Sequence, residues 1–237
     1  MQRILDLDLD FFLSDCCALA PLGARPASHE ATPWPCEQVE TFLQEHLLLS
    51  KEHPLPGRIF PTHDLALSFW AELMEAGRLS APFHVTHVDA HSDLGIGKPG
   101  PQYVLKTVLS MPPSRRTNLN LHYEHKQLDE ANYLLFALSF RWIASLDDVR
   151  IPRSRPDLPK ELFSVDDEHL LLIQSFPSLF ESLYGKEPIV PFRHTQSPET
   201  YVSEAPYDFV SLALSPRFTP GEADKLIPVF LPYLLLE

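Results

Sequence analysis

Residues 84–97 read HVTHVDAHSDLGIG, and this segment carries the strongest chemical signal in the chain. The apolar residues around Val88 predict a short buried strand. Asp89, His91 and Asp93 follow at alternate positions, so an extended backbone places their side chains on one face. Two carboxylates and an imidazole at the end of a buried strand are costly to desolvate without a cation. The segment therefore predicts half of a metal site, and its mixture of oxygen and imidazole ligands favours a hard or intermediate divalent ion.

A second acidic segment covers residues 4–12, which read ILDLDLDFF. Its period of two predicts a strand with Asp6, Asp8 and Asp10 on one face. An edge strand with outward charges is the alternative, but aspartate is unfavourable in strands. We therefore expect a buried strand whose carboxylates meet a cation. The ligating pair is either Asp6 with Asp8 or Asp8 with Asp10, and the later pair is favoured because ligands gather where strands of α/β sheets end.

His63 is a third candidate ligand. Residues 58–63 predict a short strand, and residues 65–76 predict a helix that stops at Gly77. His63 therefore falls at a strand-to-helix junction, where open α/β sheets bind their ligands. A single histidine at such a junction is more often a capping or packing residue. Its metal-binding interpretation depends on the other candidate ligands.

The remaining pattern alternates helices and strands. Helices are expected over residues 37–51, 128–145, 178–184 and 221–236. Strands are expected over residues 170–173, 189–192 and 209–214. Strands separated by helices predict an α/β fold of three layers, α/β/α, with a mostly parallel sheet. The 237 residues fit a single domain, residues 1–237.

Composition and charge limit the kinds of binding partner and the cellular compartment that we expect. The formal net charge of −13 disfavours nucleic acid and anionic lipid, because both bind basic surfaces. The apolar residues 226–236 are too few to span a bilayer and include Pro228 and Pro232. Three cysteines without a CxxC pair favour a reducing compartment, and the alternating N-terminus is unlike a signal peptide. These features predict a soluble, cytoplasmic protein.

The segment Asp89-Ala90-His91-Ser92-Asp93 resembles the DAHxD motif of the arginase/agmatinase (ureohydrolase) superfamily. Asp8-Leu9-Asp10 resembles the DxD motif of that superfamily, and Thr62-His63-Asp64-Leu65-Ala66 resembles its GGDHSLA-like junction. The resemblance implies an arginase/deacetylase-like three-layer fold that holds two Mn²⁺ ions with a bridging water or hydroxide. In this reading His91 caps one ion and Asp93 also orients the hydroxide. The six metal ligands that it implies are Asp8, Asp10, His63, Asp89, His91 and Asp93.

The order of the motifs is similar to that of one subfamily. In ordinary arginases the DxD segment follows DAHxD, whereas here it comes first, as if the DxD strand had a permuted position. This order, the opening LDLDLDFF and the core HVDAHSDLG resemble the peptide arginases. That resemblance implies a hydrolase that converts arginine side chains of a ribosomal precursor peptide to ornithine and releases urea. The partner that it implies is an arginine-containing precursor peptide.

The sequence offers more than one candidate for the residue that binds the guanidinium group of the substrate. Ser211 stands where arginases have a glutamate in a DLVEVNP-like segment. Guanidinium is always charged and offers five donors, so a carboxylate is expected to bind it, and Glu130 and Asp6 are the candidates. Asp6 and His87 are also candidates for holding the metal ligands by hydrogen bonds, and Asn132 is a further candidate near the site.

Three other functions are considered. The first is a ureohydrolase of a free guanidino compound such as arginine or agmatine. The second is a zinc amide hydrolase like the histone deacetylases, although the chain lacks their tandem His-His pair. The third is a ureohydrolase-like fold that serves only as a binding module.

Overall fold

The computed structural model describes residues 1–95, 100–158, 163–165, 170–173 and 187–237. In this part of the chain the strands form one sheet in the order β5-β6-β7-β4-β3-β1-β8-β2-β9. Seven of these strands run parallel: β9 (Leu234–Leu236), β2 (Leu55–Phe60), β8 (Phe209–Ala213), β1 (Arg3–Asp8), β3 (Phe83–Asp89), β4 (Ile143–Arg150) and β7 (Val190–Thr195). Two antiparallel strands extend the β7 edge: β6 (Leu170–Ile173) and β5 (Phe163–Val165).

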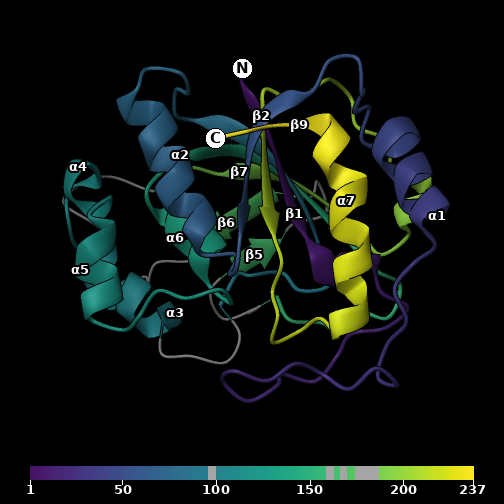
Figure 1. Cartoon of the computed structure of the whole chain (residues 1–237). Coiled ribbons are helices and arrows are strands. Elements are labelled where there is room, and N and C mark those ends of the chain that lie inside the picture. The colour runs from purple at the N-terminus through teal and green to yellow at the C-terminus, as the bar shows by residue number, and fades with distance from the viewer. Residues whose placement is uncertain (96–99, 159–162, 166–169, 174–186) are drawn as a thin grey trace.

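Helices cover both faces of the sheet (Figure 1). One face carries α2 (Leu65–Glu75), α3 (Gly100–Tyr103), α4 (Pro113–Arg116), α5 (Leu119–Glu124) and α6 (Tyr133–Ser139). The other carries α1 (Cys36–Thr41) and α7 (Ile227–Phe230). Shorter 3-10 turns cover Leu9–Phe12, Pro198–Thr200, Gly221–Leu226 and Leu231–Tyr233, and π-helical turns cover Phe42–His46 and Val104–Val108. The expected α/β fold with a mostly parallel sheet between helices is therefore present.

Two hydrophobic cores separate the three layers. Successive residues of a strand point to opposite faces, and in β1 Ile4 packs in one core whereas Leu5 and Leu7 pack in the other. The first core includes Trp70 of α2, and the second includes Phe230 of α7. Strand β1 therefore lies buried in the middle of the sheet, which excludes the edge-strand interpretation of its aspartates.

The N-terminal strand is shorter than predicted. Strand β1 ends at Asp8, and residues 9–12 form a 3-10 turn. The Asp8 side chain causes this ending, because its Oδ1 accepts a hydrogen bond from the backbone N–H of Asp10 at 3.0 Å. Asp10 therefore leaves the strand and follows the turn.

The prediction of one helix over residues 128–145 is wrong. Only Tyr133–Ser139 are α-helical, and β4 begins at Ile143. Arg141, with φ of 63°, takes the left-handed conformation that ends the helix. The run looked like one helix because a buried helix and a buried strand have the same apolar composition.

Other boundaries also shift. The predicted helix 221–236 consists of two 3-10 turns, the single turn α7, and strand β9, because Pro228 and Pro232 cannot donate helical hydrogen bonds. The predicted helix 37–51 ends earlier, at the π-helical turn Phe42–His46. Strand β2 ends at Phe60, before the predicted limit. Helix α2 and strands β6 and β8 lie where they were predicted, and β7 extends three residues beyond its predicted end. The predicted helix 178–184 lies outside the described residues.

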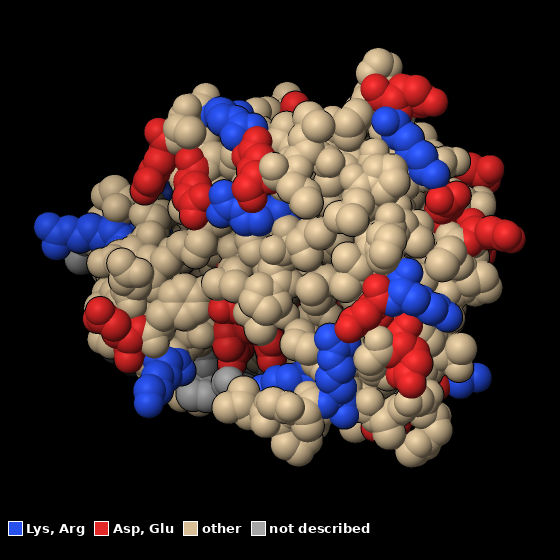
Figure 2. Space-filling view, viewed as in Figure 1, with Lys and Arg blue, Asp and Glu red and all other residues tan. Residues whose placement is uncertain are grey.

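The surface carries mixed charge. On the face that Figure 2 shows, basic side chains lie beside acidic ones around a central uncharged area. Surface pairs such as Arg58 with Glu72, 2.8 Å apart, account for part of this mixture. None of the helices in the described ranges combines the length and the apolar composition needed to cross a bilayer.

Candidate metal centre

The predicted ligands meet at the carboxyl end of the sheet. Asp8 is the last residue of β1, and Asp89 is the last residue of the neighbouring strand β3. His63 lies in the turn between β2 and α2. Because parallel strands all end at the same edge of the sheet, these segments converge although they are far apart in sequence. We call the six side chains the ligand cluster: Asp8, Asp10, His63, Asp89, His91 and Asp93.

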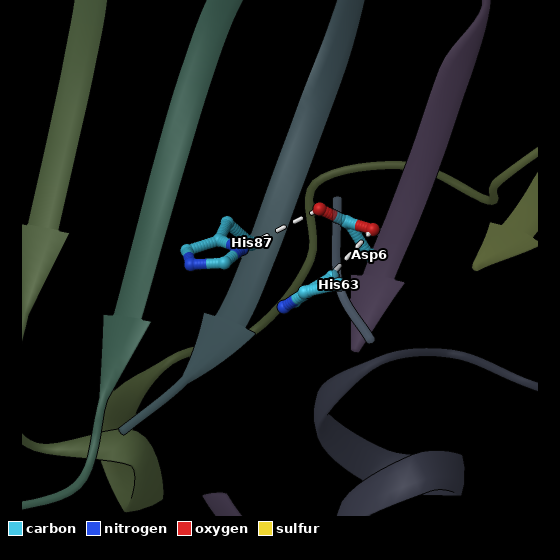
Figure 3. Close-up of side chains that lie close together, drawn as sticks. All are labelled: Asp6, His63 and His87. Carbon is cyan, nitrogen blue, oxygen red and sulfur yellow. Dashed lines mark ion pairs between the residues drawn. The ribbon is translucent and has the colours of Figure 1, made fainter. Parts of the chain in front are cut away.

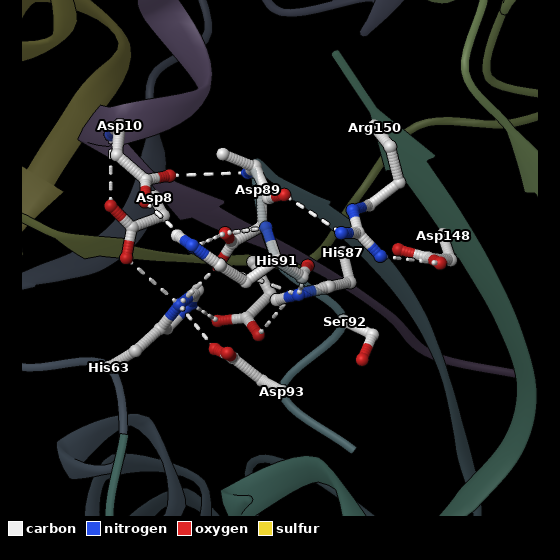
Figure 4. Close-up of polar contacts among 12 residues, drawn as sticks. Asp8, Asp10, His63, His87, Asp89, His91, Ser92, Asp93, Asp148 and Arg150 are labelled. Carbon is white, nitrogen blue, oxygen red and sulfur yellow. Dashed lines mark hydrogen bonds and ion pairs between the residues drawn. The ribbon is translucent and has the colours of Figure 1, made fainter. Parts of the chain in front are cut away.

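His63 is surrounded by carboxylates (Figure 4). Its Nδ1 lies 3.0 Å from Oδ2 of Asp89, 3.2 Å from Oδ2 of Asp8 and 3.3 Å from Oδ2 of Asp93. All four side chains are buried. One imidazole cannot neutralise three carboxylates, so this half of the cluster carries excess negative charge.

Asp89 links the two halves of the cluster. Its Oδ2 faces His63, and its Oδ1 lies 3.5 Å from Nδ1 of His91. The same His91 nitrogen lies 3.0 Å from Oδ2 of Asp10. Four sets of three potential ligands lie close together in the described residues, and two of them include His87. The other two join members of the ligand cluster, Asp8 with His63 and Asp89, and Asp10 with Asp89 and His91. Both contain Asp89, which fits the geometry of a carboxylate that serves two neighbouring ions.

Asp6 forms ion pairs with two imidazoles, those of His63 and His87 (Figure 3). Its Oδ1 is 3.2 Å from Nε2 of His63, and its Oδ2 is 3.4 Å from Nδ1 of His87. Oδ2 also accepts a hydrogen bond from the hydroxyl of Tyr133. Asp6 is fully buried and does not line the cavity described below, whereas Asp8 and Asp10 do. This arrangement favours Asp8 with Asp10 as the ligating pair and gives Asp6 the part of an orienting carboxylate.

The electrostatics of the cluster reflect crowded carboxylates. Burial and the neighbouring Asp89 raise the pKa of Asp93 to about 7. Burial, Asp8 and Asp89 raise the pKa of Asp10 well above its ordinary value. Burial opposes protonation of His91, yet Asp10 outweighs it and raises the pKa of this imidazole to about 12. Protons on histidines and carboxyl groups thus supply the positive charge that a divalent cation would supply on binding.

Two buried atoms at the base of the cluster also fit a cation nearby. Oδ1 of Asp6 and Nε2 of His63 make no hydrogen bond to the described residues, although they lie 3.2 Å apart. Unpaired buried polar atoms are rare in folded proteins. With His63 bound to a metal through Nδ1, its Nε2 would carry a proton facing Asp6, and reorientation of the two side chains would complete the hydrogen bond that is usual for a metal-binding histidine.

A cavity of about 530 Å³ opens onto the cluster. Its walls include all six members of the ligand cluster. Further lining residues come from other segments: Cys16, Cys17, Asp129, Glu130, Arg155, Asp157, Ser215, Arg217 and Phe218. Glu130 is half-buried, and its Oε1 lies 3.6 Å from Nη1 of Arg217. Burial raises the pKa of Glu130, and Arg217 opposes this shift.

Three of the sequence candidates lie outside this cavity: Asp6, described above, Asn132 and His87. Asn132 is buried at the start of α6, where its side chain accepts from the backbone of Asp129 at 3.0 Å and donates to the carbonyl of Gln127 at 2.8 Å. It shapes the turn that carries Glu130. His87 contacts the cluster from beneath, since its Nε2 lies 3.5 Å from Oδ2 of Asp89.

Sequence reasoning missed Ser215 and Tyr133 as partners of the aspartates. The Ser215 hydroxyl donates to Oδ2 of Asp8, and Ser215 takes a left-handed φ of 40°. Ser215 follows the end of β8, which neighbours β1, so its place after a predicted strand was a usable signal. No such signal existed for Tyr133, because its contact with Asp6 crosses between helix and sheet.

Comparisons with known proteins add no name to this site. A scan against known protein families finds no match to the chain, and a search of curated protein sequences finds none. The geometry defines buried Asp and His groups that could hold a metal ion at the carboxyl end of a parallel α/β sheet.

Proposed function

We propose that this protein is a binuclear manganese-dependent hydrolase that converts arginine side chains of a ribosomal precursor peptide to ornithine and urea. The observation that carries the proposal is the convergence of Asp8, His63 and Asp89, which come from three separate segments, around Nδ1 of one imidazole. The proposal includes an arginase/deacetylase-like fold in which the DxD strand comes first in the chain. Adjacent parallel pairing of β1 with β3 supports it.

The donor set fits two divalent ions. Asp8 and His63 would hold one ion, Asp10 and His91 the other, and Asp89 would contact both, with Asp93 beside His63. Carboxylates mixed with imidazoles suit manganese. Bound there, the pair of ions would lower the pKa of a shared water and supply hydroxide near neutral pH.

Glu130 is the residue that we assign to the guanidinium group. Its carboxylate lines the cavity and already lies 3.6 Å from a guanidinium nitrogen of Arg217. A charged hydrogen bond to a carboxylate is stronger than a neutral one and favours a planar cation. Glu130 would therefore hold the substrate over the ligand cluster while Asp93 orients the attacking water.

Three features support a peptide substrate in the cytoplasm. The cavity volume of about 530 Å³ falls in the range of pockets that bind drug-sized ligands, which leaves room for more than one guanidino group. Leu19, on the cavity wall, is 54% exposed and offers an apolar contact for residues next to the arginine. Cys16, Cys17 and Cys36 are free thiols, which suits a reducing compartment.

The test compares substrates and metals on the purified chain. Loaded with Mn²⁺, the protein should release urea from an arginine-containing peptide, and mass spectrometry should locate ornithine in the product. Free arginine and agmatine should react more slowly. The proposal is refuted if the manganese-loaded protein releases urea from none of these compounds. One tightly bound zinc ion per chain, together with activity on acyl-lysine, would favour a deacetylase-like enzyme.

A further inference from the structure

Arg150 lies beside the ligand cluster but outside it (Figure 4). It is the last residue of β4 and pairs in register with Asp89 on β3. Its side chain is buried, with 2% exposed. The guanidinium donates from Nη2 to the carbonyl of Ala90 at 2.8 Å, and it forms a two-pronged pair with Asp157 at 2.9 and 3.1 Å.

Residues 151–157, which we call the strap, reinforce these contacts. Oδ2 of Asp157 accepts a hydrogen bond from the backbone N–H of Ser92 at 2.9 Å, and the Ser92 hydroxyl donates to the carbonyl of Asp157 at 3.3 Å. The Ser154 hydroxyl donates to the carbonyl of Ala90 at 2.9 Å. The strap therefore binds Ala90 and Ser92, the two residues that alternate with the ligands of the DAHSD segment.

The same contacts reach the N-terminal ligands. While its carbonyl accepts from Arg150, Ala90 donates its backbone N–H to Oδ1 of Asp10 at 3.2 Å. The backbone of Ala90 is thus held by two hydrogen bonds, one from the guanidinium of Arg150 and one to the predicted ligand Asp10. A movement of Ala90 would displace Asp10 together with its neighbours Asp89 and His91.

The chemistry of this contact requires arginine. A guanidinium presents several donors in a fixed plane, so it can bind a carboxylate with two hydrogen bonds and still donate to a carbonyl. A lysine ammonium keeps the charge but lacks this geometry. The ladder between β3 and β4 already fixes the strands up to Asp89, so the additional bonds of Arg150 act on the loop that follows.

We propose that Arg150 is a positioning residue that, together with Asp157 of the strap, holds residues 90–92 so that the ligand cluster binds its metal ions tightly. This inference rests on the metal site of the proposed function, but it concerns metal affinity and not the reaction. Groups that orient metal ligands typically change the affinity by about 10–100-fold when they are removed.

The experiment measures Mn²⁺ binding by calorimetry to the full chain after chelation. Arg150→Lys should weaken binding by about 10–100-fold. The matched control is Arg116→Lys. Arg116 is also buried, and it donates to the backbone carbonyl of Ser139 and to the carboxylate of Glu187, away from the cavity. The control should lower the melting temperature of the metal-free protein as much as Arg150→Lys does, and leave the Mn²⁺ affinity unchanged.

A second variant keeps the proposal testable if Arg150→Lys does not fold. Asp157→Asn should also weaken Mn²⁺ binding, and the loss in the double variant should be smaller than the sum of the two single losses, because the two residues share a contact. Unchanged affinity in either single variant, or an equal loss in Arg116→Lys, would overturn the inference while the proposed function stands. Absence of Mn²⁺ binding to the unmodified chain would overturn both.

Discussion

Strand β3 carries two buried polar clusters, and they differ in their partners. Near its beginning, Nδ1 of His84 lies 2.7 Å from the hydroxyl of Ser145, and its Nε2 lies 2.9 Å from that of Thr86. Beside them the Tyr201 hydroxyl donates to Asp147 at 2.7 Å. We call these five residues the hydroxyl network. At the end of the same strand, Asp89 belongs to the ligand cluster, where imidazoles meet carboxylates.

The pKa values of the histidines express this difference. Burial lowers the pKa of His84 to about 4, so it stays neutral among its hydroxyl partners. Burial also disfavours the charged form of His91, but Asp10 raises the pKa of that imidazole to about 12. One carboxylate, Asp147, lies among the hydroxyl groups and 3.8 Å from Arg193, whereas the ligand cluster gathers four carboxylates around two imidazoles. Burial alone therefore does not distinguish a functional polar cluster from a structural one, but the balance of charge does.

Removing a carboxylate from each cluster should separate them most clearly. Asp89→Asn should weaken Mn²⁺ binding by more than the about 10–100-fold expected for loss of a supporting group, and should reduce urea release to background, because Asp89 contacts both halves of the ligand cluster. Asp147→Asn should leave both properties unchanged. Calorimetry and a urea assay check these outcomes, and equal effects of the two substitutions would remove the distinction.

Glu130→Gln should separate substrate binding from metal binding. Loss of a charged hydrogen bond to the guanidinium corresponds to about 1.5–3 kcal/mol, or about 10–100-fold in kcat/KM for the peptide. The Mn²⁺ affinity should not change, since Glu130 contacts Arg217 and not the ligand cluster. Glu124→Gln on α5, an exposed position away from the cavity, is the control. Unchanged kcat/KM in Glu130→Gln would exclude it as the guanidinium-binding residue.

The hydroxyl network should make stability depend on pH through His84. The pKa of His84 falls from 6.5 in the unfolded chain to about 4 in the folded protein. The unfolded state therefore gains a proton first as the pH falls, so this contribution to stability is present above pH 6.5 and is lost toward pH 4. The contribution is at most about 3 kcal/mol.

Chemical denaturation at several pH values measures this effect. His84→Gln should flatten the decline in unfolding free energy between pH 6.5 and pH 4, whatever its effect at neutral pH. If the variant and the unmodified chain decline with the same slope, His84 does not remain neutral in the folded protein.

The smallest effect is expected at Ser211, the position where arginases carry a glutamate. Its hydroxyl accepts a hydrogen bond from Nε1 of the buried Trp70 at 2.9 Å. Ser211→Ala should cost about 1–2 kcal/mol of unfolding free energy by leaving this donor unpaired. Activity should be retained, because Ser211 does not line the cavity. A loss of urea release without a loss of stability would instead give Ser211 a part in substrate binding.

Part of the candidate site was predictable from sequence because parallel strands end at one edge of the sheet. Topology brought Asp89 to His63 and Asp8, as expected. The expected extended backbone over residues 89–93 is wrong, because β3 ends at Asp89 and Asp93, with φ of 50°, takes a left-handed conformation. His91 and Asp93 reach the cluster from this irregular segment, His91 beside Asp10 and Asp93 beside His63. The period-two pattern could not reveal that the Asp8 side chain ends β1, since that depends on one side-chain hydrogen bond.

The residues that support the cluster were not predictable in the same way. Arg150 ends strand β4, but the apolar run before it predicted a helix over residues 128–145, so no strand end was expected there. Tyr133 reaches Asp6 from helix α6 across the layers. Such contacts depend on tertiary packing, which periodicity within one segment does not encode.

In the proposed site, acidic segments that are distant in sequence share a pair of metal ions. Equilibrium dialysis of the metal-free chain against Mn²⁺, followed by elemental analysis, tests it most directly. We expect two manganese ions per chain, and loss of this manganese in Asp89→Asn. A chain that retains no manganese, or retains the same amount after that substitution, would contradict it.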